Sequence, residues 1–597
     1  MAPKIYTSPF PATNLPEQSV FTYLFSSSAA TNTVGGYDAS APAFIDAPTG
    51  TRISRAQLKQ LSLTIGHGLR HHPNLSLKRG ETILIYSQNS LNWPVILFGA
   101  VAAGLRCTLA NNAYNSRELA FQYTDSGAKV IFANEDGVAT ARETLKSLGL
   151  SQSETEKRIV VLTNGLEWAG GPSAPKRSEL SGLLTMADLL KLGTLKEEEK
   201  FDGDLANETV YLCYSSGTTG KPKGVETTHK NITSVLECVK PAFPPLNLGV
   251  DSMLGILPFY HIYGAVKLLH FPLSQGAPVA IMARFDPEQF CANVEKYQIT
   301  ISLIVPPVLV VLSRHPAVDK YDMSSLKTLF SGAAPLGAAL SKQLKVSDRL
   351  LPKRKGKGPV HILQGYGLTE TSPTTHLVPS THAESKVGSI GVLLPNLEAR
   401  LVVDGDGDGN IDAEDGQPGE IWVRGPTIMK GYLNNQKATV DAITHDKWFK
   451  TGDIAIRDKD GFYYIVDRRK ELIKYKGFQV PPAELESVLL THPDIADAAV
   501  IGVDSAKEAT ELPRAYVVHA NPDSVKTDAQ KHAFSESIKK WIQGKVARHK
   551  FLRGGVVVID IVPKSAAGKI LRRELRERAK VELAGRDPSD DVVKSKL

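Results

Sequence analysis

The stretch ETILIYSQNSLNWPVILFGAVAAGL, Glu81 to Leu105, decides the fold class. Its first part, ETILIYS, is a short apolar run of the kind found in strands that are buried on both faces of a parallel sheet. The second part, NWPVILFGAVAAG, predicts a buried helix, because the apolar run is too short to cross a bilayer. A strand that leads directly into a helix indicates α/β architecture with a parallel sheet.

The same alternation continues on both sides of this stretch. ISRAQLKQLSLTIGHGLRHH, residues 53–72, has the periodicity of a helix, whereas residues up to about 50 read as loop-rich. Further short strands of the parallel type follow, namely KVIFA, RIVVLT, SMLGILP, APVAIMA, ITISLIVPP and VHILQGYG. The alternation predicts one large α/β layer structure.

The texture of the sequence changes after Gly391. ARLVVD, GEIWVRG and GFYYIVDRR are strands separated by short gaps, which predicts antiparallel hairpins or a small barrel. From Lys470 a smaller unit of helices and strands begins. The predicted fold is therefore a large N-terminal α/β domain of parallel-sheet layers with a small β-barrel-like part (residues 1–467), a small mobile α+β C-terminal domain (468–580) and a flexible tail (581–597).

Composition narrows the class of protein. The chain has 597 residues, of which 42% are hydrophobic and 22% charged, as is ordinary for a soluble enzyme of several domains. The net charge is +7, but basic and acidic residues are interleaved, which does not favour nucleic-acid binding. The four cysteines lack metal or redox spacing, so we expect them to be reduced and buried.

Of the two ends of the chain, only the C-terminal one resembles a targeting signal. The N-terminal MAPKIYTSPFPATNLPEQ has no apolar core and does not resemble a signal peptide. The last three residues, Ser595, Lys596 and Leu597, match the peroxisomal address S-K-L. We expect peroxisomal localisation, with the peroxisomal import receptor as a partner.

YSSGTTGKPKG, Tyr214 to Gly224, has the composition of a phosphate-binding loop. It is not the P-loop pattern, because Gly220-Lys221 is followed by Pro222. Its hydroxyls, its backbone N–H groups and two lysines nevertheless suit phosphate oxygens. Taken alone, a flexible surface loop explains it almost as well.

Three further segments carry groups suited to nucleotide chemistry. QGYGLTE, Gln364 to Glu370, follows a strand, and its Thr369 and Glu370 are hard oxygen ligands suited to Mg²⁺. Asp453, in WFKTGD, could bridge the two hydroxyls of a ribose. Lys569, in PKSAAGK, is a point charge that could stabilise a phosphoryl transition state. Taken alone, each segment is better explained by a structural role, so their order and spacing carry the argument.

That order, together with PFYHIYG (258–264), SGAAPLG (331–337) and VDRRKELIKYKGFQVPPAELE (466–486), resembles the acyl-adenylate-forming superfamily. Within it, the motifs look most like 4-coumarate–CoA ligases and their fungal and peroxisomal relatives, from about Thr51 to about Arg578. The resemblance implies an AMP-forming acid–CoA ligase with ATP and CoA as cosubstrates and Mg²⁺ as cofactor. A carboxylate would attack the α-phosphate of ATP to form acyl-AMP and pyrophosphate, and the CoA thiol would then displace AMP.

The resemblance also implies a role for each matching residue. The β- and γ-phosphates would be held by Ser215, Ser216, Gly217, Thr218, Thr219 and Lys223. The adenine would be framed by Ala333, Ala334, Gln364, Gly365 and Tyr366, and the ribose held by Asp453 and Arg468. Thr369 would contact the α-phosphate, Glu370 would bind Mg²⁺, and Lys569 would stabilise charge on the α-phosphate.

The thioester step would use other residues on a C-terminal domain that rotates between the two reactions. Lys470 matches the hinge position, and Lys474 would enter the site for attack by CoA. CoA itself would be bound by Arg284, Lys476 and Gly477. Separate lysines for separate steps would let one cavity exclude water from acyl-AMP and then admit a thiol.

The implied acyl pocket includes His261, Tyr263, Lys267 and Gly332, with His261 beside the carboxylate. Lys267 departs from the plant coumarate pattern, which has a small polar residue at this place. It could pair with a distal carboxylate or phenolate of the acid, or it could simply extend to solvent. The acid therefore stays open among aryl, arylalkanoic and medium-chain acids.

A separate acidic segment, DGDGDGNIDAED (404–415), places Asp404, Asp406 and Asp408 as in a calcium-binding loop. Its flanks look like strands, so an acidic hairpin tip is the favoured interpretation and a calcium site the alternative.

Three other functions fit parts of the pattern. One is a stand-alone adenylation enzyme that loads a carrier protein, and another is a luciferase-like oxygenase on the same scaffold. A binding protein without catalysis would be expected to have lost Lys569, Glu370 or Asp453, and all three are retained.

Overall fold

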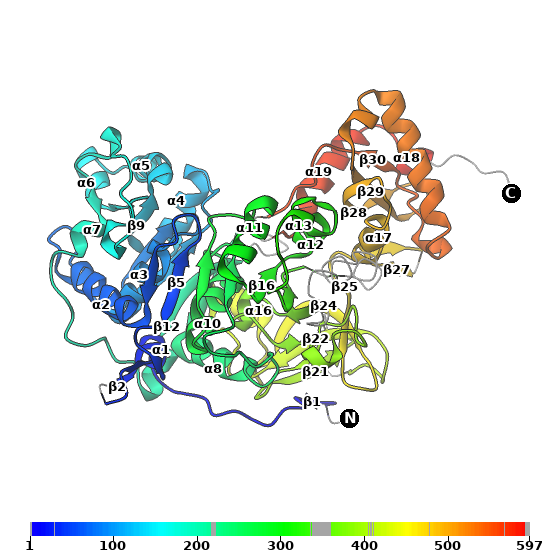
Figure 1. Cartoon of the computed structure of the whole chain (residues 1–597). Coiled ribbons are helices and arrows are strands. Elements are labelled where there is room, and N and C mark those ends of the chain that lie inside the picture. The colour runs from blue at the N-terminus through cyan, green and yellow to red at the C-terminus, as the bar shows by residue number, and fades with distance from the viewer. Residues whose placement is uncertain are drawn as a thin grey trace.

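The computed structural model describes residues 3–28, 30–215, 222–334, 336, 360–403, 405, 409, 411–476, 478–565 and 568–591. Ser595, Lys596 and Leu597 lie outside these ranges, so peroxisomal localisation stays a prediction. Within the ranges, no helix has the length and apolar character needed to cross a membrane. The chain forms a large N-terminal part and a smaller C-terminal part (Figure 1).

The first large sheet has eight strands in the order β11-β10-β9-β7-β8-β12-β13-β23. Their bounds are β7 (Thr82–Tyr86), β8 (Arg106–Ala110), β9 (Ala128–Asn134), β10 (Ile159–Leu162), β11 (Leu184–Thr185), β12 (Thr209–Ser215), β13 (Lys223–Thr228) and β23 (Gly431–Tyr432). The strands from β11 to β12 in this order are parallel, as predicted. Every residue of β7, and of the helix α3 (Asn92–Ala102) that follows it, is buried, because both segments are predominantly apolar after their first residues, Thr82 and Asn92.

The second large sheet has nine strands in the order β20-β19-β18-β17-β16-β14-β15-β5-β6. Their bounds are β5 (Pro42–Asp46), β6 (Arg52–Ser54), β14 (Met253–Gly255), β15 (Val279–Ile281), β16 (Ile301–Ile304), β17 (Thr328–Ser331), β18 (His361–Tyr366), β19 (His376–Leu377) and β20 (Val392–Leu393). The loop-rich expectation for the first 50 residues misses β5 and the helix α1 (Val20–Phe25). The segment PAFID begins with proline and ends with aspartate, which weakens the signal of a strand.

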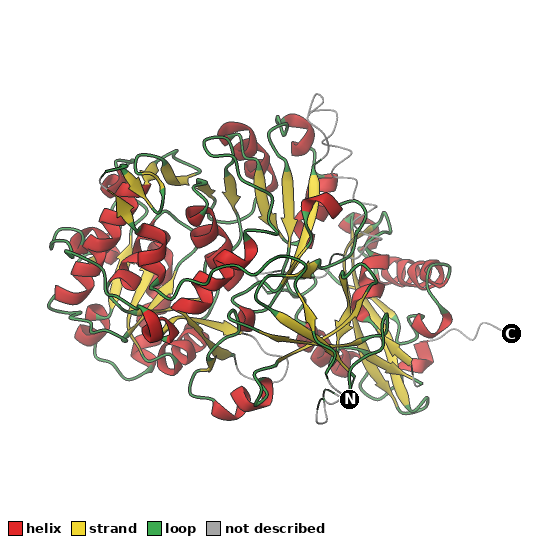
Figure 2. Cartoon of the chain, turned by 90° about the horizontal axis from the view of Figure 1, so that it is seen from below, coloured by secondary structure: helices red, strands yellow, loops and turns green. Residues whose placement is uncertain are grey.

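Helices surround these sheets (Figure 2). The predicted helix at residues 53–72 is α2 (Arg55–His71), which begins with a capping box between Ser54 and Gln57. Among the described residues, the other α-helices of the N-terminal part are α4 (Ser116–Asp125), α5 (Val138–Ser147), α6 (Gln152–Lys157), α7 (Met186–Leu189), α8 (His229–Val239), α9 (Ile262–Gly264), α10 (Phe271–Ser274), α11 (Pro287–Tyr297), α12 (Pro306–Arg314), α13 (Ala317–Lys320) and α16 (Gln436–Ala442). A π-helical segment, η5 (Ala265–His270), joins α9 to α10.

A smaller antiparallel sheet follows, as predicted from the change of texture after Gly391. It has the order β1-β21-β22-β24-β25. Its strands are β1 (Tyr6–Thr7), β21 (Glu398–Val402), β22 (Gly419–Arg424), β24 (Phe449–Arg457) and β25 (Tyr463–Arg468). The neighbouring strands β24 and β25 of this sheet place Asp453 and Arg468 opposite each other in register.

The C-terminal part has a core of its own, which gathers buried residues from Ile473 to Ala579. It contains the hairpin β26 (Ile473–Tyr475) and β27 (Phe478–Val480), and the sheet of β28 (Ile495–Ser505), β29 (Thr510–His519) and β30 (Val556–Val558). Three helices pack on these strands: α17 (Pro482–Leu489), α18 (Asp528–Gln543) and α19 (Arg572–Glu582). At the junction, the buried Asp467 carboxylate accepts the Ala483 N–H at 3.0 Å.

Candidate active site

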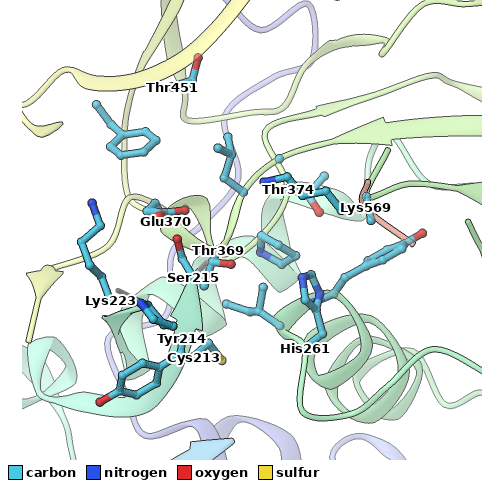
Figure 3. A pocket seen from close by; sticks show the side chains of 18 of the residues that line it. Cys213, Tyr214, Ser215, Lys223, His261, Thr369, Glu370, Thr374, Thr451 and Lys569 are labelled. Carbon is cyan, nitrogen blue, oxygen red and sulfur yellow. The ribbon is translucent and has the colours of Figure 1, made fainter. Parts of the chain in front are cut away.

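A cavity of about 1020 Å³ lies where both large sheets, the smaller sheet and a loop of the C-terminal part meet (Figure 3). It is large enough for a nucleotide together with an acid. Its lining includes these residues singled out from the sequence: Ser215, Lys223, His261, Tyr263, Lys267, Gly332, Ala333, Gly365, Tyr366, Thr369, Glu370, Arg468, Lys470 and Lys569. Residues from six separate sequence motifs thus surround one space.

The stretch with the composition of a phosphate loop connects two antiparallel strands. β12 ends at Ser215 and β13 begins at Lys223, and these two residues are paired in register. Both residues line the cavity. Ser216, Gly217, Thr218 and Thr219 lie outside the described residues, and their phosphate contacts stay a prediction.

Lys223, Tyr432 and Glu370 form a chain of contacts along this wall. The Lys223 ammonium lies 4.1 Å from the centroid of the Tyr432 ring. The Tyr432 hydroxyl donates to Oε1 of Glu370 at 2.9 Å, and Glu370 is buried. Tyr432 was not singled out from the sequence; only the pairing of β13 with β23 brings it here.

Glu370 and Thr369 fit a magnesium ion that arrives with a nucleotide. Mg²⁺ in nucleotide sites commonly takes one or two protein carboxylates and completes its shell with phosphate oxygens and water. Glu370 supplies a carboxylate at the cavity wall, and Thr369 supplies a hydroxyl next to it in the chain. These two residues would hold the metal, which would neutralise charge on the phosphates.

Close approach of backbone and side chains shapes the expected acyl and adenine sites, which adjoin in this cavity. A Cβ on Gly332 would lie 3.0 Å from the Tyr263 ring, and one on Gly365 would lie 2.8 Å from Phe330. Gly332, Ala333, Gly365 and Tyr366 line the cavity, but Ala334 and Gln364 do not. Gln364 is buried and its carbonyl accepts the Val378 N–H at 2.9 Å. Its predicted contact with adenine is therefore not visible in this arrangement.

At the expected ribose site, the Asp453 carboxylate is held by two neighbouring side chains. Asp453 Oδ2 accepts a hydrogen bond of 2.6 Å from the Tyr366 hydroxyl, and Oδ1 lies 3.2 Å from Arg468 Nε. The Asp453 carboxylate raises the pKa of the Arg468 guanidinium. Tyr366 and Arg468 line the cavity. Asp453 is not part of the lining but contacts both of these residues. The carboxylate is thus preorganised next to the nucleotide space.

Lys569 reaches the cavity from the C-terminal part on a short closed loop. The Ser565 N–H donates to the Lys569 carbonyl at 2.8 Å, and the Lys569 N–H donates to the Ser565 hydroxyl at 3.2 Å. Gly568 has a φ of +79°, and a Cβ there would lie 3.3 Å from Val305 of the N-terminal part. Burial, followed by the positive charge of Arg468, lowers the pKa of Lys569 to about 8.

His261 lies at the start of α9, where its Nδ1 accepts the Tyr263 N–H at 3.2 Å. Burial, followed by the positive charge of Lys569, lowers the pKa of His261 to about 4. The imidazole is therefore neutral near pH 7. A neutral ring is suited to orienting a carboxylate by a single hydrogen bond and adds no charge that would hold the carboxylate back from reaction.

Lys267 does not extend to solvent, so that alternative is wrong. Its residue is 5% exposed, it lines the cavity, and its Nζ has no hydrogen-bond partner among the described residues. Lys267 lies within the π-helical segment η5, all residues of which are buried. A sequence alone does not show a π-helical turn.

The residues expected to serve CoA lie elsewhere. Lys474 and Lys476 are exposed and line a shallow depression of the C-terminal part with Thr510 and Glu511. Arg284 is exposed beyond the end of β15 and does not line the main cavity. Gly477 lies outside the described residues. The structure therefore brings together most of the described residues that are expected to serve the first step, but not those expected to serve the second.

The possible calcium ligands Asp404, Asp406 and Asp408 lie outside the described residues. The flanking strands β21 and β22 form an antiparallel pair, as expected for an acidic hairpin. Of the described carboxylates in this segment, Asp412 binds Arg400 at 2.9 Å and Asp415 binds Lys4 at 2.6 Å. Within the ranges described, no three His, Cys, Asp or Glu side chains gather to hold a metal.

Comparison with known proteins agrees with this arrangement. A profile of the AMP-binding enzyme family matches residues 32–433, and one of the AMP-binding enzyme C-terminal domain matches residues 484–569. The probable 4-coumarate–CoA ligase 1 of Dictyostelium discoideum is 37% identical over 503 residues, which are 84% of this chain and 86% of that protein. The 4-coumarate-CoA ligase 1 of Narcissus pseudonarcissus is 36% identical over 546 residues, 91% of each chain.

A solved structure shows the same architecture. The o-succinylbenzoate coenzyme A synthetase from Bacillus subtilis, in complex with ATP and magnesium ion, is 26% identical to this chain. The superposition has a TM-score of 0.69 and covers 90% of this chain and 96% of the other.

Proposed function

The chain belongs to the AMP-binding enzyme family of AMP-forming acyl-CoA ligases, and from this premise we propose that it converts an aryl, arylalkanoic or medium-chain carboxylic acid into its CoA thioester. The observation that carries the proposal is the position of Lys569, which reaches from the C-terminal part into the cavity that also contains Glu370 and Lys223. Such convergence of cations and a metal-binding carboxylate suits a reaction in which negative charge develops on phosphate.

The first step would join the acid to AMP. An oxygen of the carboxylate attacks the α-phosphorus of ATP, the bond from that phosphorus to the bridging oxygen breaks, and pyrophosphate leaves. The Lys569 ammonium would stabilise the charge on the α-phosphate, and Lys223 would hold the departing phosphates. Mg²⁺, when bound, would neutralise charge on the phosphate oxygens. Asp453, held by Tyr366 and Arg468, would fix the ribose.

The second step would transfer the acyl group to sulfur. The CoA thiolate attacks the acyl carbon, the bond to the AMP oxygen breaks, and the thiol proton is released to solvent. Because Lys474 lies outside the cavity in this arrangement, the second step would require the C-terminal part to rotate. The hinge of that rotation would lie at the junction between the two parts, around Asp467 and Lys470.

Pyrophosphate release is the deciding measurement. The purified protein would be given ATP, Mg²⁺ and single acids from a panel of aryl, arylalkanoic and medium-chain acids, with and without CoA. We expect pyrophosphate with at least one acid and an acyl-CoA product when CoA is added. Lys569→Met, which replaces the cation by an apolar chain of similar length, should remove most of the release. Lack of pyrophosphate with every acid would contradict the proposal.

The same experiment separates the alternative functions. A carrier-loading enzyme would release pyrophosphate but would form no acyl-CoA. A luciferase-like oxygenase would consume oxygen after adenylation, which an oxygen electrode would record. Formation of acyl-CoA without oxygen uptake would exclude both.

A further inference from the structure

Lys267 is a cation among apolar residues of the cavity. Its Nζ lies 5.6 Å from the centroid of the Phe271 ring. Phe271 packs on Phe243, with ring centroids 4.8 Å apart, and Phe243 stacks on Phe330 at 5.8 Å. All four residues line the cavity. The amine therefore lies at an aromatic wall and is separated from bulk water.

The amine lacks the partner that such burial calls for. Nζ has no hydrogen-bond acceptor among the described residues, and no described carboxylate forms an ion pair with it. Burial lowers the pKa of Lys267 to about 7, and the one titratable neighbour that opposes this is the Cys238 thiol. Burial raises the pKa of that thiol to about 11, so the thiol is neutral and offers no counter-charge. An unpaired buried cation is costly unless an acceptor binds there.

The position of Lys267 along the chain sets a length for that acceptor. His261 caps α9, and η5 continues the same helical segment to Lys267. Lys267 lies six residues after His261, and because a π-helical turn rises less per residue than an α-helical one, the two positions are separated along the segment by less than the roughly 9 Å of an ideal α-helix. In the proposed function, His261 and Lys569 mark the end where the acid reacts. Lys267 would meet the opposite end of a bound acid.

We propose that Lys267 selects acids with a second carboxylate, placed at the far end from the one that reacts and separated from it by an apolar body. This inference rests on the proposed ligase function and narrows its substrate class to dicarboxylic acids. A carboxylate is ionised at neutral pH and forms a charge-assisted hydrogen bond with an ammonium, whereas a phenol stays neutral. The aromatic wall of Phe271 and Phe243 would cover the apolar body of the acid.

The test uses matched acids and the full-length protein. Each α,ω-dicarboxylic acid of six to twelve carbons is compared, by pyrophosphate release, with its own monomethyl ester and with the monocarboxylic acid of equal length. The aromatic pair is 4-carboxycinnamate and cinnamate, with 4-coumarate as the phenolic member. We expect the wild-type protein to show a KM about tenfold or more lower for the diacid than for its ester or monoacid.

Variants of Lys267 test whether a preference for diacids depends on its amine. Lys267→Met keeps the volume and removes the donor, so the diacid should lose its advantage while the monoacid keeps or improves its KM. Lys267→Arg keeps a cation and should retain the ranking. Lys191→Met is the matched control, because the Lys191 side chain is 74% exposed and ion-paired with Asp188, away from the cavity. It should behave as the wild type.

Each outcome decides the inference. An unchanged ranking in Lys267→Met, with pyrophosphate still released, would overturn the selection of diacids and leave the ligase function standing. A preference for 4-coumarate that Lys267→Met abolishes, without one for diacids, would overturn it in favour of a phenol. If Lys267→Met does not fold, equal KM values of diacid and monomethyl ester in the wild type would overturn it. No pyrophosphate from any acid would remove the ligase function and this inference with it.

Discussion

The hydroxyl of Tyr366 donates a hydrogen bond of 2.6 Å to the Asp453 carboxylate. Tyr366 ends β18 of the nine-stranded sheet, and Asp453 belongs to β24 of the smaller sheet. The contact therefore joins two sheets at the cavity. The Asp453 side chain is 5% exposed, and its other oxygen faces Arg468, so both of its oxygens are engaged before a nucleotide arrives.

Removing the two partners should have different effects on ATP. Tyr366→Phe loses one hydrogen bond to a charged group, and we expect the KM for ATP to rise by about threefold to thirtyfold. Asp453→Asn leaves Arg468 without its counter-charge, and kcat/KM for ATP should fall by about a hundredfold or more. Pyrophosphate release against ATP concentration measures both. Equal effects of the two substitutions would contradict the central place given to the carboxylate.

The pH dependence of the first step should reflect Lys569. Its pKa is lowered to about 8, so the ammonium is present below that pH and is lost as the pH rises through it. We expect kcat/KM for pyrophosphate release to decline above about pH 8. Lys569→Arg, which stays charged, should shift this decline upward, and Lys569→Met should show none and react about 10²–10³-fold more slowly. A decline at the same pH in Lys569→Arg would assign it to another group.

Glu370 should control the need for magnesium. Glu370→Gln retains an oxygen that can accept the Tyr432 hydroxyl, so the local fold should persist while the carboxylate charge is lost. We expect a higher Mg²⁺ concentration for half-maximal activity and a lower maximal rate. Tyr432→Phe is the control, because it removes the hydrogen bond and keeps the carboxylate. The result to the contrary would be an unchanged magnesium requirement in Glu370→Gln.

Strands and helices with a clear hydrophobic periodicity were predictable from the sequence, whereas contacts between segments far apart in the chain were not. The apolar runs of β7 and α3 predict burial, and in the structure every residue of both elements is buried. PAFID, by contrast, begins with proline and ends with aspartate, which hides β5 in the sequence, and its place is set by pairing with both β15 and β6.

The site shows the same division. The resemblance identified Glu370 and Lys569, because each lies in a distinctive motif. It did not identify Tyr432, which reaches Glu370 through a pairing of strands about two hundred residues apart in the sequence. Nor could the resemblance decide whether Lys267 faces the cavity or solvent, because its burial depends on how η5 packs in the folded chain.

Gly367 should tolerate no side chain. A Cβ there would lie 1.5 Å from the Pro373 carbonyl oxygen, which is backbone and cannot move aside cheaply. We expect Gly367→Ala to lower the free energy of unfolding by about 1–3 kcal/mol or more and to disturb the neighbouring Thr369 and Glu370. Gly544→Ala is the control, because its φ is −79° and the nearest atom lies 3.6 Å away. Denaturant unfolding followed by tryptophan fluorescence compares the two, and equal stabilities would contradict the steric argument.

Substitutions of Lys569 and of Lys474 should affect different steps of the reaction. Lys569 lies in the cavity and Lys474 outside it, so only one of them can act in the arrangement seen here. Lys474→Ala should leave pyrophosphate release without CoA within about twofold of the wild type, while acyl-CoA formation falls by about 10²-fold. Lys569→Ala should depress pyrophosphate release but still convert added acyl-AMP to acyl-CoA. Lys526→Ala, at an exposed residue of the same domain, is the matched control. Equal loss of both half-reactions in Lys474→Ala would argue against rotation, because a residue of one fixed site affects both steps together.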